Sequence, residues 1–448
     1  MDCRRRSRLA SAAALCVATF LCGGTLWSQE GGSKHIFESH PDVAPLQCPS
    51  PASTAARPPV APVDAIPDAP KLSAARAPSL PPDLVRAFAL PAPGGRLRVG
   101  VWGDSHVAGG FITDELIKRI EDAGVSVDTR EIPASLGRPG VRLPLKRVCK
   151  DGWQFQSSYV AQSSMQVGPS LSNLRSTKTG DSLWFDLRPR ADRHVRTMRI
   201  HYLPPRGRAA IGVRVDDGSE VRFEFDQAPA DGADAPGLIE VRASGSISTL
   251  KLRVLQGDVV LQGFSLVYDE AAAMTIDVFG IPSATVKGWS NADLSYLKAS
   301  LPADAYDAII LEYGTNEGAV DRFEPSRYAA MLGASLRSVR HVFPHAACLL
   351  MGPTDRGVRV PARRTGRLDL LKYSRIHQQI TRIQADVGGD FGCVVWDWQR
   401  YMGGNGSIYS WARATPPLAA YDLIHLTPLG YRRTAAALGQ SIGWLAPQ

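Results

Sequence analysis

The sequence predicts an α/β fold in which a mostly parallel β-sheet, covered by helices, is interrupted by a set of antiparallel strands. Apolar strand-like runs alternate with helical patterns over residues 96–124 and again over 274–445, which is typical of a parallel sheet covered on both faces. Between these parts, residues 125–270 show no long helical pattern and carry short period-2 runs separated by Asp-Gly, Pro-Pro and Gly-Asp turns. This second pattern predicts an inserted antiparallel β-sandwich.

The elements of the α/β part follow from periodicity in chain order. A strand ends near residue 103, and a helix from about residue 111 has an apolar face made by Phe111, Leu116, Ile117 and Ile120. In the inserted part, apolar and polar residues alternate in the runs 198–202, 213–215, 221–225 and 250–254. After it we expect strands at 274–279, 308–313, 346–351 and 393–396, and helices at 292–301, 325–342, 367–387 and 429–445.

Size and charge limit the classes of function. The 448 residues suffice for two domains of ordinary size. The net charge of +8 is mild for this length and favours approach to anionic envelope polymers or lipid head groups. No basic run is interleaved with aromatic residues, so we expect no nucleic-acid partner.

The N-terminus has the pattern of an export segment. Four arginines among the first eight residues precede an apolar stretch over residues 9–27. Residues 1–28 are therefore predicted to be a signal peptide or a signal-anchor, two alternatives that the length of the stretch does not separate. Residues 29–93 are rich in Pro and Ala and are predicted to be a semi-extended linker. We expect an exported protein, periplasmic or in the cell envelope, with membrane anchoring through residues 9–27 as one alternative.

The seven cysteines show no paired spacing that would indicate a metal cluster. Cys348 and Cys393 each lie in an apolar run, and we expect them to be buried small hydrophobic residues in preference to a bridge. One disulfide remains an alternative in an oxidising compartment.

The first strand of the α/β part leads directly to a candidate nucleophile. Residues 97–106 read Leu-Arg-Val-Gly-Val-Trp-Gly-Asp-Ser-His, an apolar run that ends in a turn before a helix. Ser105 would then lie at the carboxyl edge of the sheet, where a helix N-terminus offers free N–H groups to a developing negative charge. The alternative is that Ser105 only caps the helix.

Two further stretches supply the partners that a serine mechanism needs. Asn316 follows the predicted strand 308–313 within Gly-Thr-Asn-Glu and could donate its amide to an oxyanion; the alternative is a turn asparagine. Asp422 lies three residues before His425, a spacing that lets the carboxylate hold one ring nitrogen while the other takes the proton of Ser105. The alternative is an isolated loop histidine. For His106, beside Ser105, we expect a structural role.

Together, Gly-Asp-Ser, Gly-x-Asn and Asp-x-x-His resemble the blocks of the SGNH (GDSL-type) hydrolase family, over about residues 96–124 and 274–444. The resemblance implies a flavodoxin-like three-layer α/β/α hydrolase domain, residues 94–124 and 271–448, with residues 125–270 inserted as a carbohydrate-binding-module-like domain. The extended Gly-Asp-Ser-His-x-Ala-Gly form and the large insertion resemble the bacterial envelope branch, which includes peptidoglycan O-acetylesterases. The family's oxyanion glycine corresponds to Ser283, where a positive φ costs more than it would for glycine.

The resemblance implies a serine esterase that removes O-acetyl groups from a cell-envelope polysaccharide, with peptidoglycan as the expected polymer. Ser105 would be the nucleophile, His425 the general base and Asp422 its partner. The N–H groups of Ser105 and Ser283 and the side chain of Asn316 would bind the oxyanion. Neither a metal nor an organic cofactor is implied. The alternatives are a polysaccharide O-acetyltransferase with the same triad, a lipid acylhydrolase, and a catalytically weak glycan-binding protein.

Overall fold

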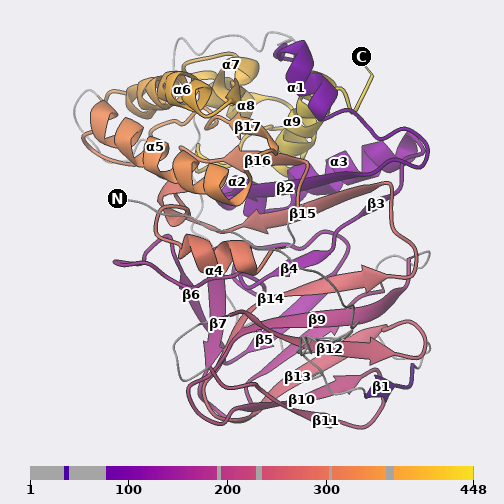
Figure 1. The fold of residues 1–448 in the computed structure, drawn as a ribbon. Helices are drawn as coiled ribbons and strands as arrows, with labels where there is room; N and C mark the ends of the chain where they lie inside the picture. The colour runs from indigo at the N-terminus through magenta and orange to yellow at the C-terminus, as the bar shows by residue number, and fades with distance from the viewer. Residues whose placement is uncertain are drawn as a thin grey trace, which may run out of the picture. The chain divides into compact units, whose positions relative to one another are not determined.

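A parallel β-sheet of six strands, in the order β18-β17-β16-β2-β15-β3, is the centre of the α/β part (Figure 1). After β2 the chain places β15 on one side of it and then β16, β17 and β18 on the other. In such doubly wound sheets a crevice forms at the carboxyl ends of the strands where the order reverses, here beside β2. The prediction of a mixed α/β fold is confirmed. The strands are β2 Leu97–Gly103, β3 Val127–Asp128, β15 Met274–Gly280, β16 Ala308–Glu312, β17 Ala347–Met351 and β18 Cys393–Trp396.

The computed structural model describes residues 35–39, 77–188, 193–228, 235–301, 305–359 and 368–446, all within one unit, residues 33–448. The predicted export segment and most of the predicted linker lie outside the described residues. Within the described part of the chain, no helix combines the length and the apolar character needed to cross a membrane.

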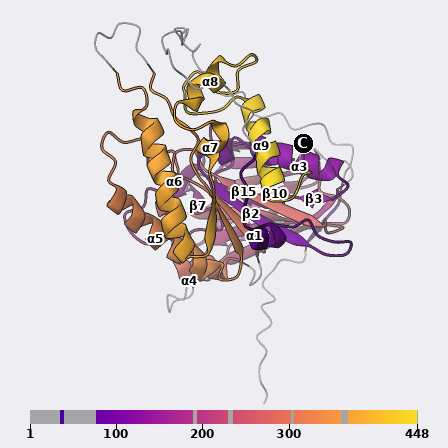
Figure 2. The ribbon, with the colours of Figure 1, turned by 90° about the horizontal axis from the view of Figure 1, so that it is seen from above.

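Helices cover both faces of the parallel sheet, and each face has its own core (Figure 2). On one face α3 and α9 pack against each other, and Ile117 and Leu438 are buried there with Val99 of β2. On the other face α5 packs on α6, and Leu336 and Ile380 are buried with Ile309 of β16. The helices are α1 Pro82–Ala87, α2 Ser105–Ala108, α3 Phe111–Asp122, α4 Leu294–Ala299, α5 Pro325–Val342, α6 Lys372–Asp390, α7 Trp398–Met402, α8 Ser407–Arg413 and α9 Pro428–Ser441, with a 3₁₀ turn, η1, at Val286–Gly288.

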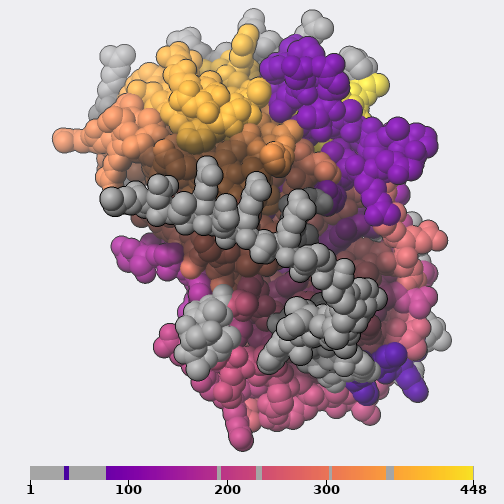
Figure 3. All heavy atoms as spheres, in the orientation of Figure 1, coloured from indigo at the N-terminus to yellow at the C-terminus, as the bar shows by residue number. Residues whose placement is uncertain are grey.

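Apart from β1 (Ile36–Phe37), the strands of two largely antiparallel sheets lie between β3 and β15 in the chain. One has the order β1-β12-β9-β14-β7-β6, with β4 also paired to β14, and the other the order β11-β10-β13-β8-β5. Their facing side chains form a third core, which contains Ile200 and Phe264 from the first sheet and Phe185 and Leu252 from the second. In Figure 3 the violet and the orange-to-yellow residues lie mainly in the upper region and the magenta-to-pink residues below them, with the indigo residues of β1 at the lower right among the pink ones. The strands are β4 Glu131–Pro133, β5 Arg147–Asp151, β6 Gln154–Ser157, β7 Ser172–Ser176, β8 Ser182–Asp186, β9 Val195–Leu203, β10 Ala210–Val215, β11 Val221–Glu224, β12 Gly237–Ala243, β13 Thr249–Gln256 and β14 Val259–Tyr268.

Two described segments of the predicted linker, residues 29–93, belong to the folded part, which differs from the prediction. Strand β1, Ile36–Phe37, pairs with β12 and buries Phe37 in the core between the antiparallel sheets. Helix α1 buries Leu84, and Phe88 directly after it packs beside Trp444. The indole N–H of Trp444 donates to the carbonyl oxygen of Phe88 at 2.6 Å. The sequence did not predict these two elements, because single apolar residues within a Pro/Ala-rich stretch show no periodicity. In the structure the same residues bury apolar surface, which stabilises both segments against the folded part.

Cys348 and Cys393 form a disulfide, so the expectation that they are separate buried hydrophobic residues is wrong. They lie directly opposite each other on the adjacent strands β17 and β18, with Cα atoms 4.6 Å apart, which is within the range of disulfide pairs. The two residues are 45 positions apart in the sequence, and only the strand order brings them together. Cys149 is also disulfide-bonded.

Candidate active site

The end of β2 places Ser105, which is partly buried, at the start of the short helix α2, at the carboxyl edge of the sheet. Asp104 is the N-cap of α2, and its Oδ1 accepts the N–H of His106 at 2.9 Å. The capping role that the sequence allowed for Ser105 therefore belongs to Asp104, and the Ser105 hydroxyl is left for other partners. A Cβ on Gly103 would lie 2.4 Å from Val107 Cγ2 and 2.9 Å from the carbonyl oxygen of Glu312, so glycine permits this close return of the chain.

Ser105, His425 and Asp422 form a continuous chain of hydrogen bonds. Ser105 Oγ lies 2.9 Å from His425 Nε2, and His425 Nδ1 lies 2.7 Å from Asp422 Oδ2. The second carboxylate oxygen, Asp422 Oδ1, accepts the backbone N–H groups of Ile424 at 3.0 Å and of His425 at 2.9 Å. These backbone bonds fix the carboxylate on the side of the ring that faces away from Ser105. The arrangement is that of a nucleophile, a general base and a carboxylate that orients the base.

The electrostatics of the pair favour the charged form of the base, which is the form that a general base takes in the transition state. Burial acts to raise the pKa of Asp422, but hydrogen bonds from the His425 ring and from the backbone outweigh it and lower the pKa to about 2. The hydrogen bond to Asp422 raises the pKa of His425 above its ordinary value, against partial desolvation, which lowers it. Asp422 therefore stays ionised and stabilises the imidazolium.

Asn316 lies in the loop after β16, next to the candidate nucleophile. Its Nδ2 donates to Asp104 Oδ2 at 3.0 Å and to the carbonyl oxygen of Ala284 at 2.8 Å. Both amide hydrogens are thus engaged within the protein itself. The bond to Ala284, the residue after Ser283, ties the loop after β16 to the loop after β15, and the bond to Asp104 ties it to the end of β2.

Ser283, the residue at the family's glycine position, has a φ of +66°. The backbone is therefore in the left-handed region that a non-glycine residue adopts at a cost of roughly 1–2 kcal/mol. Ser283 is exposed, and its N–H makes no hydrogen bond to another described residue. A free N–H in such a turn is suited to bind an anion.

Three buried carboxyl groups beneath these loops were missed by the sequence reasoning. Burial raises the pKa of Asp104 to about 6 and that of Glu317 to about 7, and it raises the pKa of Glu312 well above its ordinary value. Glu317 accepts the N–H of Val286 at 2.8 Å and that of Gly314 at 3.0 Å, so it joins the loops that carry Ser283 and Asn316. The only sequence signal for Glu317 was its place after Asn316 in Gly-Thr-Asn-Glu. Glu312 lies within a buried strand, and its position there gave no signal of a buried carboxyl group.

His106 is fully buried, with Nδ1 2.9 Å from the hydroxyl of Tyr431. Burial lowers the pKa of His106 well below its ordinary value, so the ring is neutral and packs at the base of α9, in keeping with a structural role. Within the described ranges, no three His, Cys, Asp or Glu side chains are grouped so that they could hold a metal ion.

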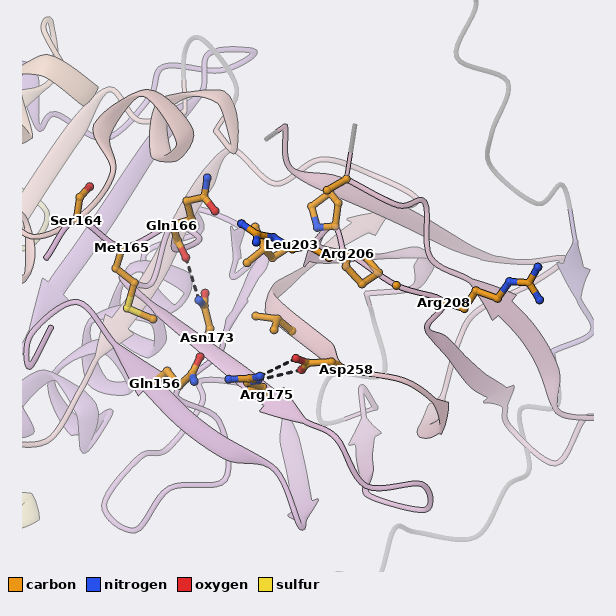
Figure 4. Close-up of a pocket in the computed structure, with 15 residues that line it drawn as sticks. Gln156, Ser164, Met165, Gln166, Asn173, Arg175, Leu203, Arg206, Arg208 and Asp258 are labelled. Carbon is orange, nitrogen blue, oxygen red and sulfur yellow. Dashed lines mark hydrogen bonds and ion pairs between the residues drawn. The ribbon is translucent and has the colours of Figure 1, made fainter. Parts of the chain in front are cut away.

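A separate pocket of about 530 Å³ lies on the antiparallel part (Figure 4). Arg175 and Asp258 form an ion pair in its wall, and Asn173 donates to the carbonyl oxygen of Gln166 at 2.9 Å. None of the residues that line it belongs to the candidate triad. Its wall is linked to the α/β part, since Met165 exchanges backbone hydrogen bonds with Asn291 and Asp293.

Comparisons with known proteins agree with this fold. A sequence model described as the GDSL-like Lipase/Acylhydrolase family matches residues 263–433. A solved structure titled "Peptidoglycan O-acetylesterase in action, 5 min" aligns over 81% of this chain and 93% of its own, at 20% identity and a TM-score of 0.59, which shows a shared fold. A family two carbohydrate esterase from Cellvibrio japonicus aligns over 67% of this chain and 98% of its own, at 10% identity and a TM-score of 0.24. A comparison with curated protein sequences finds no match.

Proposed function

We propose that this chain, which belongs to the GDSL-like (SGNH) acylhydrolase family and is a carboxylic ester hydrolase, removes O-acetyl groups from a cell-envelope polysaccharide, namely peptidoglycan. The observation that carries the proposal is the hydrogen-bond chain from Ser105 Oγ through His425 to Asp422. The choice of polymer rests on the likeness in fold to a peptidoglycan O-acetylesterase and on the mild positive charge of the chain.

In the proposed mechanism, Ser105 Oγ attacks the acetyl carbonyl carbon while His425 Nε2 takes its proton. The C–O bond to the sugar breaks as His425 returns that proton to the leaving hydroxyl, which leaves an acetyl-enzyme on Ser105. His425 then takes a proton from water, the hydroxide attacks the acetyl group, and acetate leaves as Ser105 is protonated again. Asp422 holds the ring tautomer and stabilises its charged form throughout.

The oxyanion would be bound by the N–H groups of Ser105 and Ser283 and by the side chain of Asn316. Because Asp104 and the carbonyl of Ala284 occupy both amide hydrogens of Asn316, the oxyanion must replace one of them as acceptor. We assign that exchange to Asp104, because its carboxyl group lies beside the residue that bears the acetyl group. The bond to Ala284 then keeps the amide in place.

We further propose the domain division that the sequence suggested: a hydrolase domain of residues 94–124 and 271–448 with the flavodoxin-like three-layer fold, and an inserted carbohydrate-binding-module-like β-sandwich of residues 125–270. The pocket of Figure 4 supports glycan binding because it is amphipathic. Leu203, Pro204 and Val260 offer apolar surface to the C–H face of a sugar, while Gln156 and the Arg175–Asp258 pair offer donors and acceptors to its hydroxyl groups. Residues 1–28 would export the protein, as a cleaved signal or as an anchor.

Acetate release tests the proposal. Wild-type protein is compared with Ser105→Ala, and with Ser290→Ala as a control in an exposed turn, on O-acetylated peptidoglycan, acetylated xylan and a long-chain ester. We expect release from peptidoglycan that Ser105→Ala abolishes and Ser290→Ala retains. Wild-type rates in the Ser105→Ala variant would overturn the mechanism, and a preference for the long-chain ester would indicate a lipid acylhydrolase. Acetyl transfer to an added glycan in place of acetate release would indicate an acetyltransferase.

A further inference from the structure

Arg356 lies between the two loops that carry the proposed catalytic residues. It follows β17, and its Nη1 donates to the carbonyl oxygen of Thr315, next to Asn316, at 3.3 Å. On its other side, the N–H of Gly357 donates to the carbonyl oxygen of Leu423, between Asp422 and His425, at 2.9 Å. The sequence reasoning did not single out this arginine, because nothing around it marks it as different from the chain's other cations.

The segment that bears Arg356 is held by bonds that do not involve its guanidinium group. The neighbouring Asp355 is fully buried, and its carboxylate accepts the Nε2–H of Gln399 at 2.8 Å, the N–H of Ile408 at 2.9 Å and the hydroxyl of Ser374. Thr354 O lies 2.6 Å from His377 Nδ1. These bonds of the neighbouring residues therefore hold the backbone of Arg356 in position between the two catalytic loops.

The guanidinium group has more donors than acceptors around it. Arginine carries five N–H donors, yet within the described residues Arg356 makes one side-chain hydrogen bond, to Thr315, and no ion pair, and its Nε is buried without an acceptor. Arg340, also half-buried, differs: its guanidinium donates to the carbonyl oxygens of Phe391, Phe343, Ala346 and Gly392. Arg340 therefore acts as a structural clamp, whereas the Arg356 guanidinium has no ion-pair partner among the described residues.

The charge of Arg356 acts on the catalytic groups. Burial lowers the pKa of Arg356, against the opposing effects of Tyr373, Asp422 and Asp104, and arginine remains protonated at any working pH. The guanidinium carbon lies 4.6 Å from the ring centre of Tyr373. This cation–π contact holds the guanidinium group beside that ring.

We propose that Arg356 forms an anion subsite that binds a carboxylate of the polymer next to the acetylated sugar. A planar guanidinium fork with free Nη donors matches a carboxylate in a bidentate pair. The subsite rests on the proposed function, because it defines which acetylated glycans are preferred: those with a carboxylate near the ester over neutral ones. In peptidoglycan the carboxylates of the peptide supply such groups.

The test uses O-acetylated muropeptides, either with free carboxylates or with the same carboxylates converted to amides. For the wild type we expect kcat/KM to be about 10- to 100-fold higher on the free form, the range for a charge-assisted bond to an ionised group. Arg356→Met should bring this ratio close to 1, and Arg356→Lys should restore part of it. Arg375→Met, which removes an exposed arginine paired with Asp369, should leave the ratio unchanged.

The ratio of kcat/KM on the two forms distinguishes carboxylate recognition by Arg356 from a purely structural role of this residue. If Arg356→Met slows both forms equally, the arginine only supports the loops and the proposal is overturned; a wild type that does not distinguish the forms overturns it too. Binding of both forms to Ser105→Ala, with and without Arg356→Met, gives the same comparison by calorimetry without turnover. Preferential binding of the free form that depends on Arg356, without any acetate release by the wild type, would support the subsite and reject the proposed function.

Discussion

The side-chain nitrogen of Asn316 lies 3.0 Å from Oδ2 of Asp104, the residue directly before the proposed nucleophile. The other oxygen of the same carboxyl group caps the turn of helix that begins with Ser105. One buried carboxyl group thus sets the position of the proposed nucleophile relative to the proposed oxyanion donor. Burial raises its pKa to about 6, while hydrogen bonds from its neighbours act to lower it.

Replacing Asn316 with Ala should lower kcat by about 100- to 1,000-fold, the cost of losing one oxyanion donor. KM should change much less, because the bond to the oxyanion forms only in the transition state. Steady-state kinetics on a small acetyl ester measures both values. A variant within threefold of the wild-type kcat would show that the amide only ties the two loops together.

Replacing Asp422 with Asn should lower kcat by about 10⁴-fold, because the ring loses the group that fixes its tautomer. Activity requires unprotonated His425, so kcat/KM rises as the pH increases through the pKa of that ring. Its hydrogen bond to Asp422 raises this pKa above the ordinary value, so the acidic limb of the variant's pH profile should move to lower pH. A limb that stays in place would contradict the assignment of His425 as the base.

Replacing Ser283 with Gly should increase stability by up to about 1.6 kcal/mol. Relief of the left-handed backbone at φ +66° is worth roughly 1–2 kcal/mol, and the greater freedom of glycine in the unfolded chain offsets about 0.4–1 kcal/mol of it. The proposed donor is a backbone N–H, so turnover should be retained. Chemical denaturation and kinetics on one preparation check both points, and a large loss of activity would implicate the Ser283 hydroxyl instead.

Replacing Glu312 with Gln should make stability less dependent on pH. Burial raises the pKa of Glu312 well above its ordinary value, so the folded state keeps a proton that the unfolded state releases above about pH 4.5. The stability that this proton provides is present below that pH and is lost as the pH rises toward the raised pKa. The stability of Glu312→Gln relative to wild type should therefore increase from pH 5 to pH 8 in denaturant titrations. The opposite trend would mean that Glu312 is ionised in the folded protein.

Replacing Cys348 and Cys393 together with Ala should lower the free energy of unfolding by about 2–4 kcal/mol, the typical contribution of a disulfide. The bridge joins β17 to β18 at the edge of the sheet, away from the triad in sequence and strand order, so activity at low temperature should persist. An unchanged denaturation midpoint would show that the strand pairing and the surrounding core hold this edge without the bridge.

The sequence by itself determined the local elements and the candidate chemistry. Backbone hydrogen bonding imposes periods of 2 and 3.6 on apolar residues, which is why helix 325–342 and strand 393–396 were predicted with the bounds that α5 and β18 have. Motif spacing singled out Ser105 and Asn316, because each follows a strand and carries a polar group in a turn, and the Asp422–His425 pair, because the two lie three residues apart in a turn that leads into a helix.

The tertiary structure alone decided which distant residues meet. Ser105 and His425 are 320 positions apart, and only the strand order brings them within a hydrogen bond. The same order pairs Cys348 with Cys393, sets Glu312 under Asp104, and places Arg356 between the catalytic loops. Such contacts produce no periodic pattern in the sequence. They depend on which distant strands pair and on which side chains the packed core buries.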